Sequence, residues 1–346
     1  MFSPEIQNLI SKIKINSTDF SINHPNYLPE NLPDNIIKKI SILPEEIQNN
    51  YLKILLINFV FGIYSNGTRI LEKSHSLKTD YAFSLENIYS GIDWEFCEKL
   101  QKNNHGRGWW NPNYRVLRQE ADGTLALQKL GITVHIQRNR HLRLEEQLAM
   151  LGDLVSIFTP PEQITNQLYA AYGDFIVTFS NSVAIIYFNF SSEGAVAVMR
   201  DLTVRLNALK VPFIFYVLNN PSNYKRYDSG FLRFNKDSYV LVRQVLQTVY
   251  VKNESHFQAQ VPIFTKVLAP GLSLAETPES ELEFIDNFGR NLCQIIANAL
   301  LEAHKNGDES KEARMKYILK HFDHFKIDLE RPYLNPDSED IYTPLD

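Results

Sequence analysis

The chain has 346 residues, of which 44% are hydrophobic and 12% aromatic, so it can bury a large core or two joined subdomains. Its net charge of −5, from 35 basic and 40 acidic residues, excludes a global bias toward nucleic acid or an anionic membrane. The two cysteines, Cys97 and Cys293, lie in helix-like patterns and are expected to be buried thiols of a cytosolic protein.

The longest apolar run covers residues 51–64 and contains Lys53 and Asn58. It is shorter than the ~20 residues that a bilayer span requires, so we expect a buried helix there and no membrane association. The first fifteen residues lack the basic start, apolar centre and cleavage site of a signal peptide. These features predict a soluble, cytoplasmic chain.

Residues 1–104 are predicted to be a helical N-terminal region. Helix signals cover residues 33–42 and 44–67, and Ser84 and Asp93 are candidate N-caps of two further short helices. The Asn-rich stretch 16–35 is expected to be an irregular connection.

Alternating patterns begin at residue 105 and predict a small antiparallel β subdomain over residues 105–161, with Asp122-Gly123 as a hairpin turn. Between residues 105 and 143 the chain has seven Lys and Arg, two acidic residues and three histidines. This local excess of cations could bind a phosphorylated or acidic partner. It could equally be a solvated sheet face that acidic helices balance elsewhere.

Residues 183–326 alternate strand and helix patterns and predict a mixed α/β core that ends in two helices. The first strand–helix–strand unit is long enough for a parallel crossover. Residues 327–346 carry six acidic residues and one basic residue and are expected to be an extended tail. We therefore predict the α+β class, with residues 105–346 as one domain after the helical N-terminal region.

Well-known catalytic and cofactor signatures are absent. The chain has no phosphate-binding glycine loop, no paired CxxC, no HExxH and no GxSxG. His321 and His324 lie three residues apart on a Lys-rich helix, which is more typical of a solvated edge than of a metal site. We expect no metal and no cofactor.

Four segments do form a familiar ordered string. "YFNFSSEGA", "LNALKVPFIFYVLNNPSNYKRYDSGFLRF", "VPIFTKVLAPGLSLAETP" and "FGRNLCQIIANALLEAH" occur in this order between residues 187 and 304. The string resembles the HopA-type family of bacterial type III secretion effectors. That family has relatives in gene clusters for ribosomally made, modified peptides, including lanthipeptide and thioviridamide-like compounds.

The resemblance implies a fold like that of phosphothreonine lyases, and elimination of phosphate from phosphorylated Ser or Thr to leave a dehydroamino acid. Expected partners are a phosphorylated peptide or protein, such as a ribosomal precursor peptide and its kinase. The resemblance is also compatible with secretion and with a non-catalytic role in binding a peptide or protein, because the plant-pathogen effector is better known for its protein interactions.

β-Elimination needs a base for the Cα proton and cations for the phosphate. Lys266 is the predicted base or phosphate contact, just ahead of a Pro-Gly turn. Arg226, held by Asp228 two residues on, is predicted to bind the phosphate, with Tyr224 as a further donor. The alternative for this loop is an exposed Arg–Asp pair that contributes about 0–1 kcal/mol.

Four further polar residues in the matched segments complete the predicted phosphate and substrate site: Asn189, Thr265, Glu276 and Arg290. Arg290 either pairs with Asp286 on its own helix or reaches into a cleft. Asn189 ends the first strand of the matched region, where ligands of open α/β sheets tend to bind.

Two positions depart from the pattern of the peptide-modifying relatives. Ile185 and Tyr216 occur where those relatives often carry cations. The loss of two cations weakens a phosphate site, which favours the non-catalytic alternative. Trp109 and Trp110, in a Gly-flanked stretch expected to be a loop, would suit an interface if exposed, or a sheet edge if buried.

Overall fold

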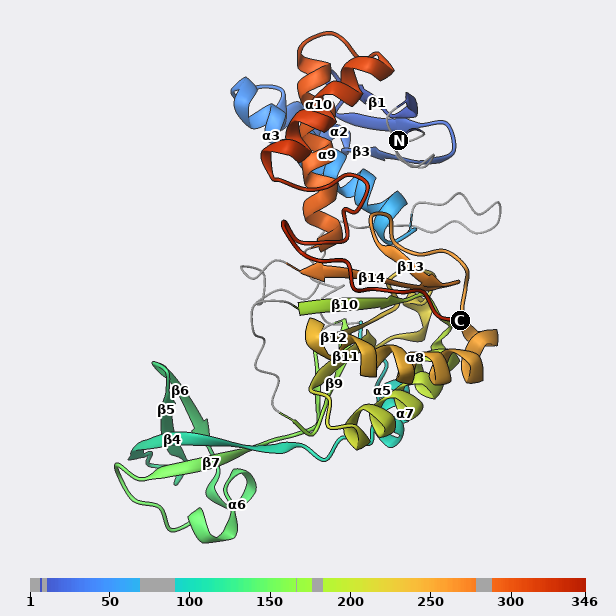
Figure 1. Ribbon diagram of the computed structural model, residues 1–346. Coiled ribbons are helices and arrows are strands. Elements are labelled where there is room, and N and C mark those ends of the chain that lie inside the picture. The colour runs from blue at the N-terminus through green and yellow to red at the C-terminus, as the bar shows by residue number, and fades with distance from the viewer. Residues whose placement is uncertain (1–6, 8–10, 69–90, 166, 176–182, 278–287) are drawn as a thin grey trace.

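The computed structural model describes residues 7, 11–68, 91–165, 167–175, 183–277 and 288–346 (Figure 1). Its centre is a seven-stranded sheet with helices on both faces, and a small sheet projects from it (Figure 1). The predicted α+β class is confirmed.

The central sheet has the strand order β13-β14-β10-β12-β11-β9-β8, and every neighbouring pair is antiparallel. β10 and β11 run parallel to each other, as the predicted crossover requires, because both are antiparallel to β12, which lies between them. The strands are β8 (Glu162–Ile164), β9 (Leu168–Tyr172), β10 (Val183–Phe188), β11 (Phe213–Leu218), β12 (Gly230–Asn235), β13 (Lys266–Ala269) and β14 (Leu272–Thr277).

One face of the sheet packs against α5 (Trp94–Asn103), α7 (Ser192–Ala208) and α8 (Tyr239–Asn253), and we call it the α7–α8 face. Asp93 caps α5 as predicted, since its side chain accepts a hydrogen bond from the Phe96 N–H. Ser191 caps α7 in the same way. Ser84, the other predicted cap, lies outside the described residues.

The opposite face packs against α3 (Glu45–Val60), the π-helical turn η1 (Phe61–Ser65) and α9 (Phe288–Lys305), and we call it the α3–α9 face. The helix α10 (Lys311–His324) lies along α9 (Figure 1). Both cysteines are buried free thiols, as expected. Within the described ranges, no helix has the length and apolar character needed to cross a membrane.

The prediction of an irregular stretch at residues 16–35 is wrong. β1 (Lys14–Asn16), β2 (Ser21–His24) and β3 (Tyr27–Asn31) form an antiparallel sheet, followed by α2 (Asp34–Ile40). Strands this short show too little alternation to be recognised, and they are stabilised by contacts between the buried Ile22 and α3. The two ring nitrogens of His304 contact Ser17 Oγ (2.7 Å) and Glu309 Oε1 (2.6 Å), which ties this sheet to α9.

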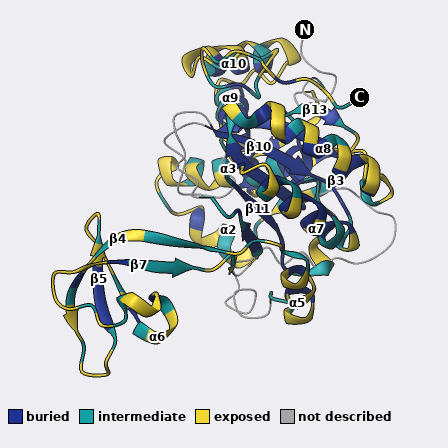
Figure 2. Cartoon of the chain, turned by 60° about the horizontal axis from the view of Figure 1, so that its bottom comes forward, coloured by how far each residue is buried: buried dark blue, intermediate teal, exposed yellow. Residues whose placement is uncertain are grey.

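The projecting sheet comprises residues 109–159, and we call it the β arm (Figure 1). Its core contains six buried apolar residues, and most of its surface is exposed (Figure 2). Trp109 and Trp110 belong to a strand and not to the expected loop, and both are half-buried. The elements are β4 (Trp109–Gln119), β5 (Leu125–Lys129), β6 (Ile132–Ile136), α6 (Arg138–His141), η2 (Leu144–Glu146) and β7 (Leu154–Thr159).

The C-terminal residues 327–346 form neither helix nor strand, as expected of an extended tail, but they pack closely on the central sheet. The Glu276 N–H donates to the Tyr333 carbonyl (2.8 Å), and the Leu345 N–H donates to the Leu268 carbonyl (2.8 Å). The remaining short helical turns are η3 (Pro221–Asn223), η4 (Lys236–Ser238) and η5 (Glu254–His256).

Candidate functional site

Arg226 and Asp228 form a two-point ion pair in the loop between β11 and β12. Arg226 Nε and Nη2 donate to the two carboxylate oxygens of Asp228 at 2.7 and 2.6 Å. Asp228 is buried, whereas the Arg226 side chain keeps 25% exposure. The Ser229 hydroxyl donates to the Arg226 carbonyl (2.7 Å), so the carboxylate orients the guanidinium and Ser229 holds the backbone of the same residue.

Tyr224, predicted as a phosphate donor in the same loop, points into the core. Its hydroxyl donates to the Leu218 carbonyl (2.7 Å), and its ring packs on Phe96 and Phe190. Burial raises its pKa well above the ordinary value. Tyr224 therefore closes the loop from within, on the α7–α8 face.

The loop also contacts the segment that follows η1. The Tyr227 N–H donates to the Asn66 carbonyl (3.0 Å). Gly67 has φ +71°, and a Cβ at this position would lie 2.6 Å from the Tyr227 ring. Glycine is therefore required at Gly67 both by the left-handed backbone and by the close approach of Tyr227.

Arg290 reaches the same part of the chain from α9. Its Nη2 donates to Asn58 Oδ1 (3.2 Å), and its guanidinium lies 6.0 Å from the centre of the Phe61 ring. The residue is exposed. Its predicted partner Asp286 lies outside the described residues. The segment 58–68 thus contacts both Arg290 and, through Tyr227, the loop that carries Arg226.

Arg233 in β12 is a buried arginine that the sequence analysis missed. It is 4% exposed in the middle of the central sheet. Its partners across the sheet are Ile185 and Ile214, so it lies on the α3–α9 face. A hydrogen bond joins its side chain to Tyr216. Burial raises the pKa of Tyr216, and the nearby Arg233 opposes this only in part. The available signal was one cation in the otherwise apolar string "GFLRF".

Polar and aromatic side chains surround Arg233 on this face. Phe231 precedes it by two residues, stacks on Tyr216 (4.7 Å between ring centres) and faces Tyr187 across the sheet. Ser273, fully buried, is the partner of Tyr187 on β14. We call the group of Tyr187, Tyr216, Phe231, Arg233 and Ser273 the arginine face.

Lys266 lies away from these arginines. Its Nζ contacts the two oxygens of Asp340 at 2.9 and 2.7 Å, and Tyr333 donates to the same carboxylate (2.6 Å). Burial opposes ionisation of Asp340, but the bonds from Lys266 and Tyr333 outweigh it and hold the pKa of that carboxyl below its usual value. The pair attaches the C-terminal tail to β13.

Glu276 holds the tail from the next strand. It is 1% exposed and contacts Lys236 Nζ (2.8 Å), the Tyr342 hydroxyl (2.8 Å), the Ser338 hydroxyl (2.9 Å) and the Asn335 N–H (2.9 Å). Burial and the Glu276 carboxylate raise the pKa of Tyr342. We call these contacts and the Lys266–Asp340 pair the tail clamp.

The strand register separates the tail clamp from the arginine face. Lys266 pairs with Leu274, then Ile186, then Leu232, so it is directed toward the α7–α8 face while Arg233 is directed toward the other. Three strand spacings of about 4.8 Å, or about 14 Å, also lie between β13 and β12. The predicted cations therefore do not all meet at one site.

The two remaining predicted residues make main-chain contacts. The Thr265 hydroxyl donates to the Pro262 carbonyl (2.5 Å). Asn189 is buried, and its Nδ2 donates to the Gln260 carbonyl (2.9 Å). Its backbone N–H donates to the Gly271 carbonyl (2.8 Å), so Asn189 secures the end of β10.

The described residues hold no cluster of three or more metal-ligating side chains. His321 contacts Glu302 (2.7 Å), an acceptor on the neighbouring helix α9. These contacts account for the histidine without a metal.

An all-antiparallel sheet with helices packed on both faces defines a protein of the α+β class. The model of the HopA1 effector protein family matches residues 159–334, which is about half of the chain. The chain belongs to this family. The match includes the Arg226 loop, Arg233, Lys266, Glu276 and Arg290, and it begins at the last residue of β7, so most of the β arm lies outside it.

Two solved structures are similar to the chain. The effector protein from Pseudomonas syringae pv. tomato strain DC3000 has 13% identity and a TM-score of 0.45, with 86% of this chain and 94% of that chain covered. The effector protein from Pseudomonas syringae pv. syringae strain 61 has 13% identity and a TM-score of 0.42, with 71% and 86% covered. No curated protein matches the chain.

Proposed function

We propose that the chain binds a peptide phosphorylated on Ser or Thr at the arginine face and eliminates the phosphate to leave a dehydroamino acid. The observation that carries the proposal is the burial of Arg233 at the centre of the sheet, on the face covered by α3 and α9, the helix that carries Arg290. A buried guanidinium is costly unless ionic or hydrogen-bonding partners accept it, and its planar fork suits a phosphate.

Arg233 also bears on the two positions at which the sequence departs from the peptide-modifying relatives. The peptide-modifying relatives often carry cations where this chain has Ile185 and Tyr216. Arg233 is the cross-strand partner of Ile185 and hydrogen-bonds Tyr216, so it supplies a cation to the same part of the sheet from a different strand. One relocated arginine can then replace part of the missing charge.

In the proposed reaction a base takes up the Cα proton, and the electron pair of the broken Cα–H bond forms the Cα=Cβ double bond. The Cβ–O bond breaks, and phosphate leaves with that bonding pair. Arg233 and Arg226 bind the phosphate oxygens, Asp228 positions Arg226, and Arg290 adds positive charge. The base is Lys225, next to Arg226, since Lys266 is directed toward the other face of the sheet and is paired with Asp340.

The test is mass spectrometry of synthetic pSer and pThr peptides after incubation with the purified chain. A lyase product lacks the mass of phosphoric acid, whereas a hydrolysed product keeps the hydroxyl. Lys225→Ala should abolish turnover without unfolding the chain, whereas Lys266→Ala, on the opposite face of the sheet, should retain it. Retention of the phosphate on every pSer and pThr peptide tested would contradict the proposal.

The second candidate function is non-catalytic binding of a peptide or protein. It is favoured by the Arg226–Asp228 pair, in which a carboxylate already engages one of the predicted phosphate ligands at 2.6 and 2.7 Å. A phosphopeptide that is retained with measurable affinity and released unmodified would select this alternative. Either function is compatible with action in the cytoplasm or after secretion.

A further inference from the structure

The β arm exposes a group of large apolar side chains next to its short helix α6. Leu144, Leu148, Met150 and Leu151 are 82%, 88%, 75% and 75% exposed. Single exposed leucines are ordinary, but four large apolar side chains exposed within eight residues are of the kind that marks an interaction site.

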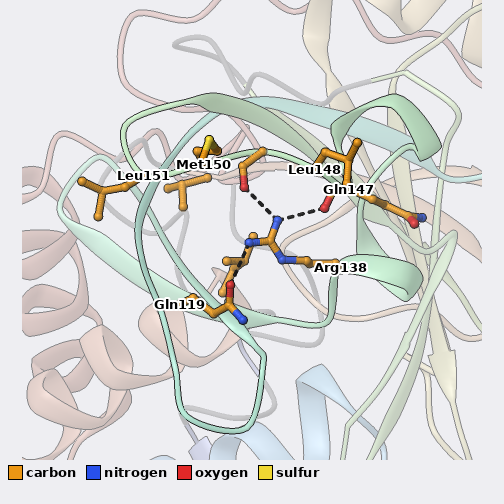
Figure 3. A pocket seen from close by; sticks show the side chains of 9 residues that line it. Gln119, Arg138, Gln147, Leu148, Met150 and Leu151 are labelled. Atoms are coloured by element: carbon orange, nitrogen blue, oxygen red, sulfur yellow. Dashed lines mark hydrogen bonds between the residues drawn. The ribbon is translucent and has the colours of Figure 1, made fainter.

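Three of these residues, Leu148, Met150 and Leu151, line a pocket of about 430 Å³ (Figure 3). Its lining includes the buried core residues Val116 and Leu125, as well as the exposed Leu148, Met150 and Leu151. An apolar side chain that enters the pocket would therefore meet the core of the arm and be covered by the exposed rim.

Arg138 holds the pocket open. Its Nη1 donates to the carbonyls of Gln147 (2.9 Å) and Ala149 (2.8 Å), and its Nη2 donates to Gln119 Oε1 (3.2 Å) (Figure 3). These bonds fix the backbone of the segment that carries the exposed leucines. The pocket is thus formed before any partner binds, which reduces the entropy lost on binding.

The charge beside the pocket is positive. Residues 138–143, "RNRHLR", contain three arginines and a histidine with no carboxylate, and Arg140 and Arg143 are exposed. The arm as a whole has a net charge of +1 against −5 for the chain. Two carboxylates of the arm have local roles, since Glu146 accepts from the Ser156 N–H and Asp153 accepts from the Met150 N–H.

We propose that the pocket of the β arm binds an unphosphorylated peptide stretch that combines leucine-like side chains with acidic residues. The inference rests on the proposed function in one respect: this stretch belongs to the same substrate whose phosphorylated residue reaches the arginine face. The apolar pocket selects the inserted side chain, and the arginines beside it select the acidic flank. Binding at the arm raises the local concentration of the phosphorylated residue at the central sheet.

The binding test uses a random twelve-residue peptide display library on the immobilised full chain. Enriched peptides should pair apolar with acidic residues, and their affinity should fall at least about tenfold in the double variant Leu148→Glu/Met150→Glu. Both positions are exposed, so folding is expected to persist. The matched control is Val267→Glu, at a 53% exposed apolar position on β13, which should bind normally. Equal binding to the double variant, or enrichment of basic peptides, would overturn the proposal.

Two other occupants of the arm have their own readouts. Light scattering that shows a dimer in the wild type and a monomer in the double variant would make the pocket an interface between copies of the chain. Flotation with phosphatidylserine vesicles that is lost in the double variant would make it a membrane contact. Either result would replace the peptide as occupant.

A kinetic comparison separates this inference from the proposed function. A phosphopeptide joined to the selected stretch should show a KM about tenfold or more below that of the short phosphopeptide, with kcat unchanged. The double variant should lose this difference. If neither peptide is converted while the selected stretch still binds the arm, the lyase proposal fails and the docking site stands. If both are converted with the same KM, the docking proposal fails.

Discussion

The two faces of the central sheet are built from the same strands and differ sharply in chemistry. On the α7–α8 face, β10, β11 and β12 present Ala184, Ile186, Phe188, Phe213, Phe215, Val217, Leu232 and Phe234 to the core. On the α3–α9 face they present Tyr187, Tyr216 and Arg233 among apolar neighbours. Buried polar groups cost free energy that an apolar residue would avoid, so a face that retains them is the one expected to carry function.

Glu276 is the main exception to the apolar character of the α7–α8 face, and it sharpens the comparison. Its side-chain contacts are with Lys236 in η4 and with Asn335, Ser338 and Tyr342 in the C-terminal tail. Each of these contacts joins two segments of the same chain, as a structural ion pair does. The arginine face differs because its cation belongs to the sheet itself and lies on the face covered by α3 and α9.

The largest expected effect comes from Glu276→Gln. The change removes one charge from a buried pair and leaves Lys236, 12% exposed, beside a neutral amide. We expect a loss of about 3 kcal/mol in the free energy of unfolding, measured by urea denaturation. The exposed Glu145→Gln is the control and should change stability by less than about 0.5 kcal/mol. If Glu276→Gln were as stable as the wild type, the structural role proposed for the tail clamp would be contradicted.

Replacement of Arg233 by Met tests the arginine face directly. Phosphopeptide affinity should fall about 10- to 100-fold, because a hydrogen bond to a charged group contributes about 1.5–3 kcal/mol. Leu232→Met, the neighbour directed to the opposite face, should leave affinity unchanged. Arg233→Lys keeps the positive charge but lacks the planar guanidinium, so its affinity should be intermediate. This variant separates loss of the phosphate contact from a folding defect caused by Met. Equal affinities for Arg233→Met and Leu232→Met would show that the faces do not differ in function.

Gly67→Ala tests whether the Arg226 loop depends on the segment after η1. The new methyl group meets both a left-handed backbone and the Tyr227 ring, so we expect a loss of about 1–3 kcal/mol and weaker phosphopeptide binding. Gly123→Ala is the matched control, since Gly123 has φ +84° and open space around it. Thermal unfolding of both variants isolates the contribution of the Tyr227 contact to stability. If both variants lose the same free energy of unfolding, the Tyr227 contact contributes nothing.

The smallest expected effect is on pH dependence. The pKa of Asp340 is lower in the folded chain than in an unfolded one, where it is about 3.9. Its contribution to stability is therefore fully present above about pH 4 and is lost as the pH falls through the folded pKa. We expect proteases to cut the C-terminal tail faster in acid than at neutral pH, and Asp340→Asn to show faster cutting already at neutral pH. A wild-type tail that is equally resistant at both pH values would contradict this.

Part of the site could be predicted from sequence because it is local. Arg226 and Asp228 are two residues apart in one turn, so their pairing needs only the loop conformation. Lys266 and Glu276 stand out in the sequence as polar residues of the matched segments, but their partners Asp340 and Lys236 lie 74 and 40 positions away. No local pattern reveals such partners, and these two residues were assigned to a substrate where the structure shows the tail.

The sequence by itself determined the α+β class, the family, the Asp93 cap and the buried thiols, because these follow from periodicity, capping chemistry and ordered motifs that are written in neighbouring residues. Only the tertiary structure decided on which side of the sheet each charge lies. That outcome depends on the register of β10, β12 and β14, in which a shift of one residue would turn every side chain to the opposite face.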